Sequence, residues 1–225
     1  GCIAWRVQWQ SRDRRELIKG SYHRGELPAT LMDLALKSIE EHGTEKLSLR
    51  ALAREAGVSP TAPYRHFSSK QCLLAAIATQ GFHTLRERRQ ANVDWQLPVE
   101  ERTVAMALSY VDFAIKNPTA YRLMFGSVLG DFSEFQMLEQ AVTAAYEDVD
   151  KLLTEIIEHP SLDADSAQLG GVVWSFLHGL SSLIINDVLV GQVDSKPKRA
   201  VSALRADYEA ALRLMFDRLF TVQPD

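Results

Sequence analysis

The segment SLRALAREAGVSPTAPYRHFSSK, residues 48–70, limits the possible folds of this chain more than any other stretch. Ser48 is a good helix N-cap, because a serine hydroxyl accepts a free backbone N–H of the first turn. Leu49 and Leu52 then follow at helical spacing and predict one apolar face. Gly57 predicts the end of that helix, since glycine adopts the left-handed conformation without a Cβ penalty. We therefore expect a short helix that is closed by a sharp turn.

A second short helix is predicted within a few residues of the first. Ser59 can cap it, and Pro60 fits its first position, where the missing N–H costs nothing. The helix over 59–66 is expected to end at Phe67, which packs inward. Two short helices joined by a tight turn form a helix-turn-helix, whose second helix reaches base edges in the major groove of DNA. The spacing therefore predicts a DNA-binding domain.

The side chains expected to face DNA lie on and around this second helix. Thr61, Ala62 and Pro63 are expected to read base edges, because they occupy its N-terminal end. Lys70 lies in the first turn of the next helix, where it opposes the helix dipole; a phosphate contact would explain that small cost. The expected DNA-binding residues are Ser48, Arg50, Ser59, Thr61, Ala62, Pro63, Tyr64, His66 and Lys70.

Residues 22 to about 85 resemble the N-terminal domain of the tetracycline-repressor (TetR) family of bacterial transcription regulators. The matching positions are the helix over 29–42, Gly43, residues 47–50, Ala53, residues 56–59, Tyr64, His66, Phe67 and Lys70. The combination is specific because several fixed spacings coincide. The resemblance implies a three-helix DNA-binding domain.

A narrower resemblance covers the later part of the chain. Trp174, His178 and Gly179 are similar to the Trp–His–Gly (WHG) signature of one class of C-terminal domain in that family. Residues 117–118 and 121–125 fit the same class. This resemblance implies an effector-binding and dimerisation domain.

The whole chain is predicted to be all-α, because no sustained alternation of period two competes with the helical pattern. The helices expected after the motif cover 70–89, 98–116, 119–125, 133–158, Asp163 or Asp165 to about Val190, and 197–220. The expected domains are an extension over 1–21 that fits the rest poorly and has disorder as one interpretation, a helix-turn-helix domain over 22–70, a connecting helix over 71–90, and an effector-binding and dimerisation domain over 91–225.

Charge is unevenly distributed along the 225 residues. Residues 1–90 hold 15 Lys and Arg against 9 Asp and Glu, whereas residues 91–225 hold 10 against 20. A basic first part and an acidic second part suit a protein that needs phosphate attraction at one end only.

The helix expected over 167–190 is apolar on nearly every side. A membrane span is the alternative, but the run is slightly short and contains His178 and several serines. We expect this helix to be buried between its own core and a second subunit, so that two helices from each subunit make a four-helix interface. The expected interface residues are Gly171, Leu204, Tyr208, Ala211, Leu212 and Met215.

Aromatic residues on several helices predict an apolar cavity with few polar anchors, which favours a hydrophobic or aromatic effector. Each of these residues alone is more often a core residue than a ligand contact. The expected ligand-binding residues are Met106, Tyr110, Phe113, Tyr121, Phe125, Phe132, Trp174 and His178.

Two other classes of function compete with a regulator. A helical enzyme using His178 has little support, because Ser181, Ser182 and Asp187 lie on the same expected helix as that histidine. A ligand-binding protein without DNA binding is the second alternative. We expect no catalytic residues, no metal and no cofactor. The preferred interpretation is a homodimeric, cytoplasmic bacterial repressor that binds a double-stranded operator and an unidentified small effector, without a membrane partner.

Overall fold

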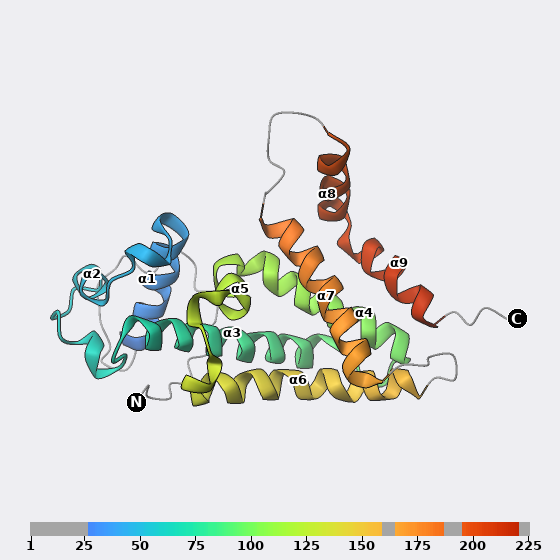
Figure 1. Ribbon diagram of the computed structural model, residues 1–225, viewed down its shortest axis with the longest axis horizontal. Coiled ribbons are helices and arrows are strands. Elements are labelled where there is room, and N and C mark those ends of the chain that lie inside the picture. Colours follow the sequence, from blue (N-terminus) through green and yellow to red (C-terminus); the bar gives the residue numbers. More distant parts are fainter. Residues whose placement is uncertain (1–26, 159–164, 187–194, 221–225) are drawn as a thin grey trace, which may run out of the picture. The chain divides into compact units, whose positions relative to one another are not determined.

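The computed structural model describes residues 27–158, 165–186 and 195–220, and every regular element in these ranges is helical (Figure 1). The α-helices are α1 (Leu27–His42), α2 (Leu49–Glu55), α3 (Lys70–Asn92), α4 (Val99–Lys116), α5 (Pro118–Phe125), α6 (Gln136–Ile157), α7 (Ser166–Ile185), α8 (Lys196–Ala206) and α9 (Tyr208–Phe220). Single 3₁₀ turns are η2 (Thr44–Lys46), η3 (Pro63–Arg65), η4 (Ser127–Leu129) and η5 (Phe132–Glu134). The all-α prediction is confirmed, with an N-terminal helix-turn-helix region followed by a helical domain. The extension predicted over 1–21 lies outside the described residues.

The chain divides into two compact units. The first comprises the described residues up to Thr84 together with 119–143, and the second comprises 85–118 and the described residues from Ala144 onward. This division differs from the one expected from the sequence, because α5 and the following turns join the first unit. Helix α3 contributes its first part to one unit and its last part to the other.

In the first unit, a core of apolar side chains fixes the three N-terminal helices. Leu31, Leu52 and Phe67 are almost fully buried, and they come from α1, from α2 and from the chain just ahead of α3. Helix α3 also packs closely against α5: a Cβ added at Gly81 would come within 2.4 Å of the Met124 Sδ. A larger residue at position 81 would therefore force the Met124 side chain to move.

In the second unit, helices α4, α6 and α7 and the residue that follows α3 share one apolar cluster. Its buried members are Val93, Met106, Leu152, Leu153, Ile156 and Leu169. At its edge, Arg102 of α4 donates to the Glu155 carboxylate of α6, with 2.8 Å from Nη1 to Oε2. This hydrogen-bonded ion pair holds the pKa of Glu155 below its ordinary value.

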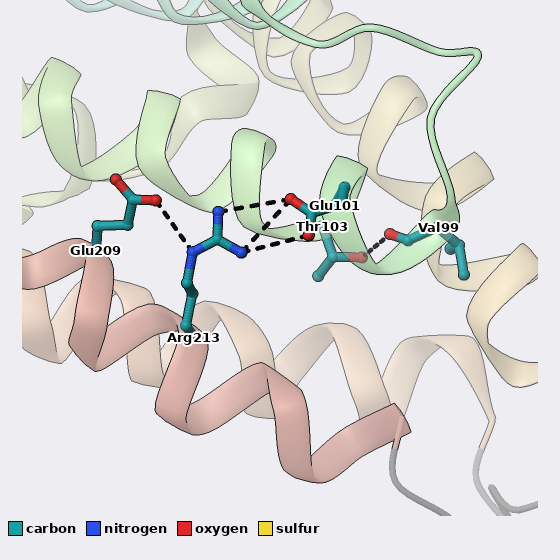
Figure 2. Close-up of polar contacts among 5 residues, drawn as sticks. All are labelled: Val99, Glu101, Thr103, Glu209 and Arg213. Atoms are coloured by element: carbon teal, nitrogen blue, oxygen red, sulfur yellow. Dashed lines mark hydrogen bonds and ion pairs between the residues drawn. The ribbon is translucent and has the colours of Figure 1, made fainter.

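The last predicted helix, 197–220, is two helices in the structure, which corrects that prediction. Asp207 has an extended φ of −152°, and its Oδ1 accepts a hydrogen bond from the Ala210 N–H at 2.9 Å. An aspartate side chain that satisfies the backbone in this way favours the start of a new helix. Arg213 then joins α9 to Glu101 of α4, with 3.4 Å between Nη1 and Oε1, and to Glu209 of its own helix (Figure 2).

Helix α7 begins where one of the two predicted caps lies. The Asp165 Oδ1 accepts from the Gln168 N–H at 2.7 Å, and the helix ends at Ile185. The other predicted cap, Asp163, and the predicted end near Val190 lie outside the described residues. Among the described helices, α7 alone is long and apolar enough to span a membrane by length and composition, and 33% of its apolar window is buried.

Candidate DNA-binding surface and effector region

The turn after α2 is the part of the motif that the sequence predicts most closely. Gly57 has a φ of +69°, the left-handed conformation that glycine adopts most readily. The Gly57 N–H donates to the Arg54 carbonyl at 3.1 Å, and the Val58 N–H donates to the Ala53 carbonyl at 2.9 Å. These two bonds form a Schellman motif, which satisfies the last carbonyls of α2. The predicted helix end at Gly57 is confirmed.

The start of α2 differs from the prediction in one respect. Ser48 has the extended backbone of an N-cap, and its carbonyl accepts from the Leu52 N–H at 3.0 Å. Its hydroxyl, however, makes no capping hydrogen bond. The exposed side chain of Ser48 is therefore available for other contacts.

The second helix of the motif, predicted over 59–66, is not an α-helix in the structure. The chain passes through a turn at Pro60 and Thr61 and continues into the 3₁₀ turn η3. The Ser59 carbonyl accepts from the Ala62 N–H at 3.0 Å, because an α-helical bond would need an N–H on residue 63, and Pro63 has none. Bonds of the i to i+3 type continue to His66, so Pro63 converts the expected helix into tighter turns.

Most of the side chains expected to bind DNA lie on the surface of the first unit. Ser48, Arg50, Ser59, Thr61 and Tyr64 are exposed, and 46% of the Tyr64 surface is accessible. Ala62, His66 and Lys70 are half-buried.

Two members of the expected set, Pro63 and Lys70, have structural roles. Pro63 is buried, so it contributes by shaping the turn rather than by touching bases. The Lys70 Nζ donates to the Thr44 carbonyl at 3.1 Å and links the first residue of α3 to η2. One donor of the expected phosphate ligand is therefore already in use.

Arg65 is exposed beside Tyr64 and was absent from the expected set. Its position within the predicted second helix was the signal that could have identified it, since guanidinium groups are the preferred ligands of phosphate and guanine. Arg50, Arg54 and Arg65 are all exposed, so the segment over 48–70 presents basic side chains to solvent.

In the second unit, the structure brings together three of the expected effector-binding residues. The Trp174 Nε1 donates to the Tyr110 hydroxyl at 3.2 Å, which ties α7 to α4. The Trp174 and His178 rings lie 6.0 Å apart along α7. Burial lowers the pKa of His178 below its ordinary value of 6.5, so the imidazole is neutral at pH 7.

The other expected effector-binding residues have varied surroundings. Met106 belongs to the apolar cluster of the second unit, and Phe113 is fully buried there. Tyr121 and Phe125 belong to the first unit, where their rings lie 4.9 Å apart and Phe82 meets Phe125 edge-on at 5.5 Å. The side chain of Phe132 lies outside the described residues.

A buried guanidinium in the second unit was missed by the sequence reasoning. Arg89 of α3 is only 5% exposed, and its Nη2 donates to the Ala145 carbonyl of α6. Burial lowers the pKa of Arg89 to about 10, while the nearby Asp148 carboxylate acts in the opposite direction. The three arginines of the segment RERRQ, residues 86–90, are typical of a solvent-exposed helix face, so the sequence gives no sign that one of them is buried.

The expected dimer residues face their own subunit more than was predicted. Leu212 is fully buried, and the Tyr208 hydroxyl donates to the Asp112 carboxylate of α4 at 2.5 Å. Leu204, Ala211 and Met215 are half-buried, whereas Gly171 is exposed with open space where a Cβ would stand.

The exposed apolar surface of this region lies on other residues of the same helices. Val172 and Trp174 of α7 are 53% and 51% exposed, and Leu214 of α9 is 71% exposed. Leu183, nearer the C-terminal end of α7, is also exposed. The apolar character of α7 therefore continues onto its outer surface.

Comparison with known proteins finds two matching family models. Residues 31–77 match the model described as bacterial regulatory proteins, tetR family, and residues 103–208 match a tetracyclin repressor-like C-terminal domain. The HTH-type transcriptional regulator YobS of Bacillus subtilis is 28% identical over 164 residues, which cover 73% of this chain and 82% of that protein.

Solved structures share the fold of this chain. A structure of a protein from Rhodococcus sp. RHA1 is 28% identical, with a TM-score of 0.63 over 86% of this chain and 98% of that one. The TetR family transcriptional regulator PfmR from Thermus thermophilus shares the fold at 20% identity, with a TM-score of 0.60 over 81% of this chain and 96% of that one. The chain therefore carries an N-terminal and a C-terminal domain that both match tetR-family models, and it is a DNA-binding transcription regulator.

Proposed function

We propose that this protein is a homodimeric repressor of the bacterial cytoplasm that leaves its operator when a small hydrophobic effector binds the second unit. The observation that carries the proposal is the exposed polar and basic face formed between α2 and α3, directly ahead of a long helix that continues into the second unit. We also assign the C-terminal domain to the Trp–His–Gly class, on the basis of Trp174, His178 and Gly179.

The DNA contacts follow from exposure and chemistry. Thr61 and Ala62 would read base edges, because they stand at the outer turn of the motif. Ser48, Arg50, Tyr64 and Arg65 would bind phosphates on either side. In this proposal His66 and Lys70 lie at the margin of the contact, and Pro63 sets the shape of the turn.

A second copy of this chain would cover the apolar surface of α7 and α9. An apolar helix face that is half exposed in one subunit is stabilised when the same face of another copy packs against it, and such contacts are self-complementary about a two-fold axis. Gly171, Val172 and Leu214 would lie at this contact. The two helix-turn-helix motifs of the dimer would then bind two half-sites of one operator.

Helix α3 would couple the effector to DNA. Its first residue lies at the helix-turn-helix, and its last turns belong to the unit that holds Tyr110 and Trp174. An effector that binds more tightly to the arrangement that does not fit the operator must weaken DNA binding by the same factor by which DNA weakens effector binding.

The test is a genome-wide selection of DNA fragments with the purified full-length chain, followed by footprinting of the bound fragments. We expect an inverted repeat whose half-sites are about one helical turn apart. The double substitution Tyr64→Ala with Arg65→Ala should abolish protection, while Lys37→Ala, a change on the exposed side of α1, should retain it. Fragments without any repeat, or full protection by the double variant, would contradict the proposal.

A further inference from the structure

The buried guanidinium of Arg89 lacks the partners that such a group normally has. Its Nη2 donates to the Ala145 carbonyl, but Ala145 lies inside α6, where a carbonyl already accepts an intrahelical hydrogen bond. The Arg89 Nε is fully buried and has no hydrogen-bond partner among the residues that the structure describes. Burying a guanidinium with an N–H that has no acceptor is costly, so its presence needs a reason.

The Asp148 carboxylate, which acts on the charge of Arg89, is hydrogen-bonded to other side chains. Asp148 is buried and accepts hydrogen bonds from the Arg86 Nε at 3.4 Å and from the Gln90 Nε2 at 3.3 Å. Glu147 faces Arg86 as well, with 3.7 Å between Oε2 and Nη2. Arg86 is therefore paired twice, whereas the direct hydrogen bond of Arg89 ends at a neutral carbonyl.

Arg89 nevertheless remains charged under physiological conditions. Its pKa is about 10, so only about one molecule in a thousand is neutral at pH 7. The interior of the second unit thus holds a permanent cation. The Tyr110 phenol, whose hydroxyl accepts from Trp174, lies close enough to act on that charge.

We propose that Arg89 binds the anionic group of the effector, and that the effector is accordingly a hydrophobic monocarboxylate. This inference rests on the proposed function and specifies the chemistry of its effector. A guanidinium offers paired N–H donors that match one carboxylate, and the hydrogen bond of Arg89 to a neutral carbonyl leaves such donors for a ligand. The apolar part of the effector would lie among the aromatic side chains of α4 and α7, with Tyr110 as a second polar contact.

Two other buried side chains support the binding of a polar group inside the second unit. The Oγ atoms of Ser109 on α4 and Ser181 on α7 are buried, and neither has a hydrogen-bond partner within the described part of the chain. Together with the Arg89 Nε, they give the second unit three buried polar atoms whose hydrogen bonds are unmet. Such atoms are satisfied when a ligand or an ordered water binds.

The experiment compares acids with their uncharged amides on the full-length dimer at pH 7.5. The probes are decanoate with decanamide and 2-naphthoate with 2-naphthamide, and the readouts are thermal stabilisation and calorimetric affinity. We expect at least one acid to bind at least about tenfold more tightly than its amide, because the amide keeps the shape and loses the charge. Arg89→Gln should remove this preference. Arg86→Gln, which deletes an equal charge that is already paired, should retain it.

Equal affinity of acids and amides, an acid preference that survives Arg89→Gln, or binding of neither acid would overturn the inference. A second variant separates binding from folding. Arg89→Met should keep the melting temperature at or above that of the unliganded wild type, because a buried guanidinium with an unmet N–H is replaced by an apolar chain. A clearly lower melting temperature would assign Arg89 to the link with Ala145 instead. Operator binding is measured in parallel: its absence would overturn the proposed function, whereas its presence without an acid preference overturns this inference alone.

Discussion

The helix-turn-helix region, residues 27–70, and the helical body, the described residues from α3 onward, differ in whether their polar side chains are buried. Among the residues described from 27 to 70, no polar or charged residue is buried as a whole, although the His66 Nδ1 is, and the interior is made by residues such as Leu31, Leu52 and Phe67. From α3 onward the described interior contains Thr79, Gln80, Thr84, Arg89, Arg102, Thr103, Ser109, Asp148 and Ser181. The first region presents its polar side chains on the surface, where a large rigid partner can reach them. The second region also buries polar side chains, and only a small molecule could reach those.

The largest effect is expected from substitutions of two leucines on α9, because one leucine is buried and the other is exposed. Leu212→Glu places a carboxylate at a fully buried position and should cost roughly 3–5 kcal/mol of folding free energy. Leu214→Glu, at a position that is 71% exposed, should leave the subunit folded and prevent dimerisation. Circular dichroism and sedimentation distinguish the two results. A folded Leu212→Glu subunit, or a dimeric Leu214→Glu variant, would show that the faces of α9 are assigned wrongly.

A smaller effect is expected at the turn of the helix-turn-helix. Gly57→Ala should cost about 1–2 kcal/mol, because a Cβ disfavours the left-handed backbone. The added Cβ would contact nothing within 4 Å, so the whole cost comes from the backbone. Gly57→Asn is the matched variant, since asparagine tolerates this conformation better. We expect the urea unfolding midpoint to be highest for the wild type, lower for Gly57→Asn and lowest for Gly57→Ala. Equal midpoints for the two variants would show that the left-handed backbone is not the cause of the cost.

The salt dependence of DNA binding should separate two basic residues of the same region. Arg65→Ala should lower the slope of log affinity against log salt by about 0.9, the value for one phosphate contact. Lys70→Ala should change the slope less, because Nζ is held by the Thr44 carbonyl, and should instead cost about 1 kcal/mol of stability. Titrations at several salt concentrations, with Lys37→Ala as the control, decide between them. A larger change of slope for Lys70→Ala would restore it as the main phosphate ligand.

The smallest effect is expected for the ion pair at the edge of the body. Its hydrogen bond with Arg102 holds the pKa of Glu155 below the ordinary value of 4.5. The stabilisation is therefore present above pH 4.5 and is lost as the pH falls through the lower, folded value. Glu155 is half exposed, so solvent screens the pair and the gain is small. Melting curves from pH 6 to pH 3 should show the wild type and Glu155→Gln converging in acid; a constant difference would contradict this reason.

The same contrast explains which features could be predicted from the sequence. The end of α2 at Gly57 and the start of α7 at Asp165 depend on one residue and its immediate neighbours, and both are confirmed. The prediction of a second helix in the motif was wrong. Pro60 suits the start of a helix, but Pro63 has no N–H for the next α-helical hydrogen bond, and this loss decides the conformation. The single helix predicted over 197–220 was wrong because the side chain of Asp207 competes with the backbone.

Features that depend on tertiary packing were harder to predict. Leu212 and Leu214 are both apolar, and only the packing of α9 against α4 determines which one is buried. Arg89 lies in a polar run and is buried because its side chain meets α6, a contact between residues 56 positions apart. The lining of the expected effector region stays a prediction, since aromatic spacing does not distinguish a core from a binding site.

The hydrogen bond from the Lys70 Nζ to the Thr44 carbonyl has a consequence for protein engineering. It joins the two ends of the segment over 44–70, so the part of the chain that carries the proposed DNA contacts is a closed loop that packs on α1. Segments whose ends lie together are the ones that proteins exchange with least disturbance to the rest of the structure. Residues 44–70 therefore form a natural cassette: transplanted between relatives with its lysine and threonine ends intact, it would transfer operator specificity and leave the effector response of the recipient in place.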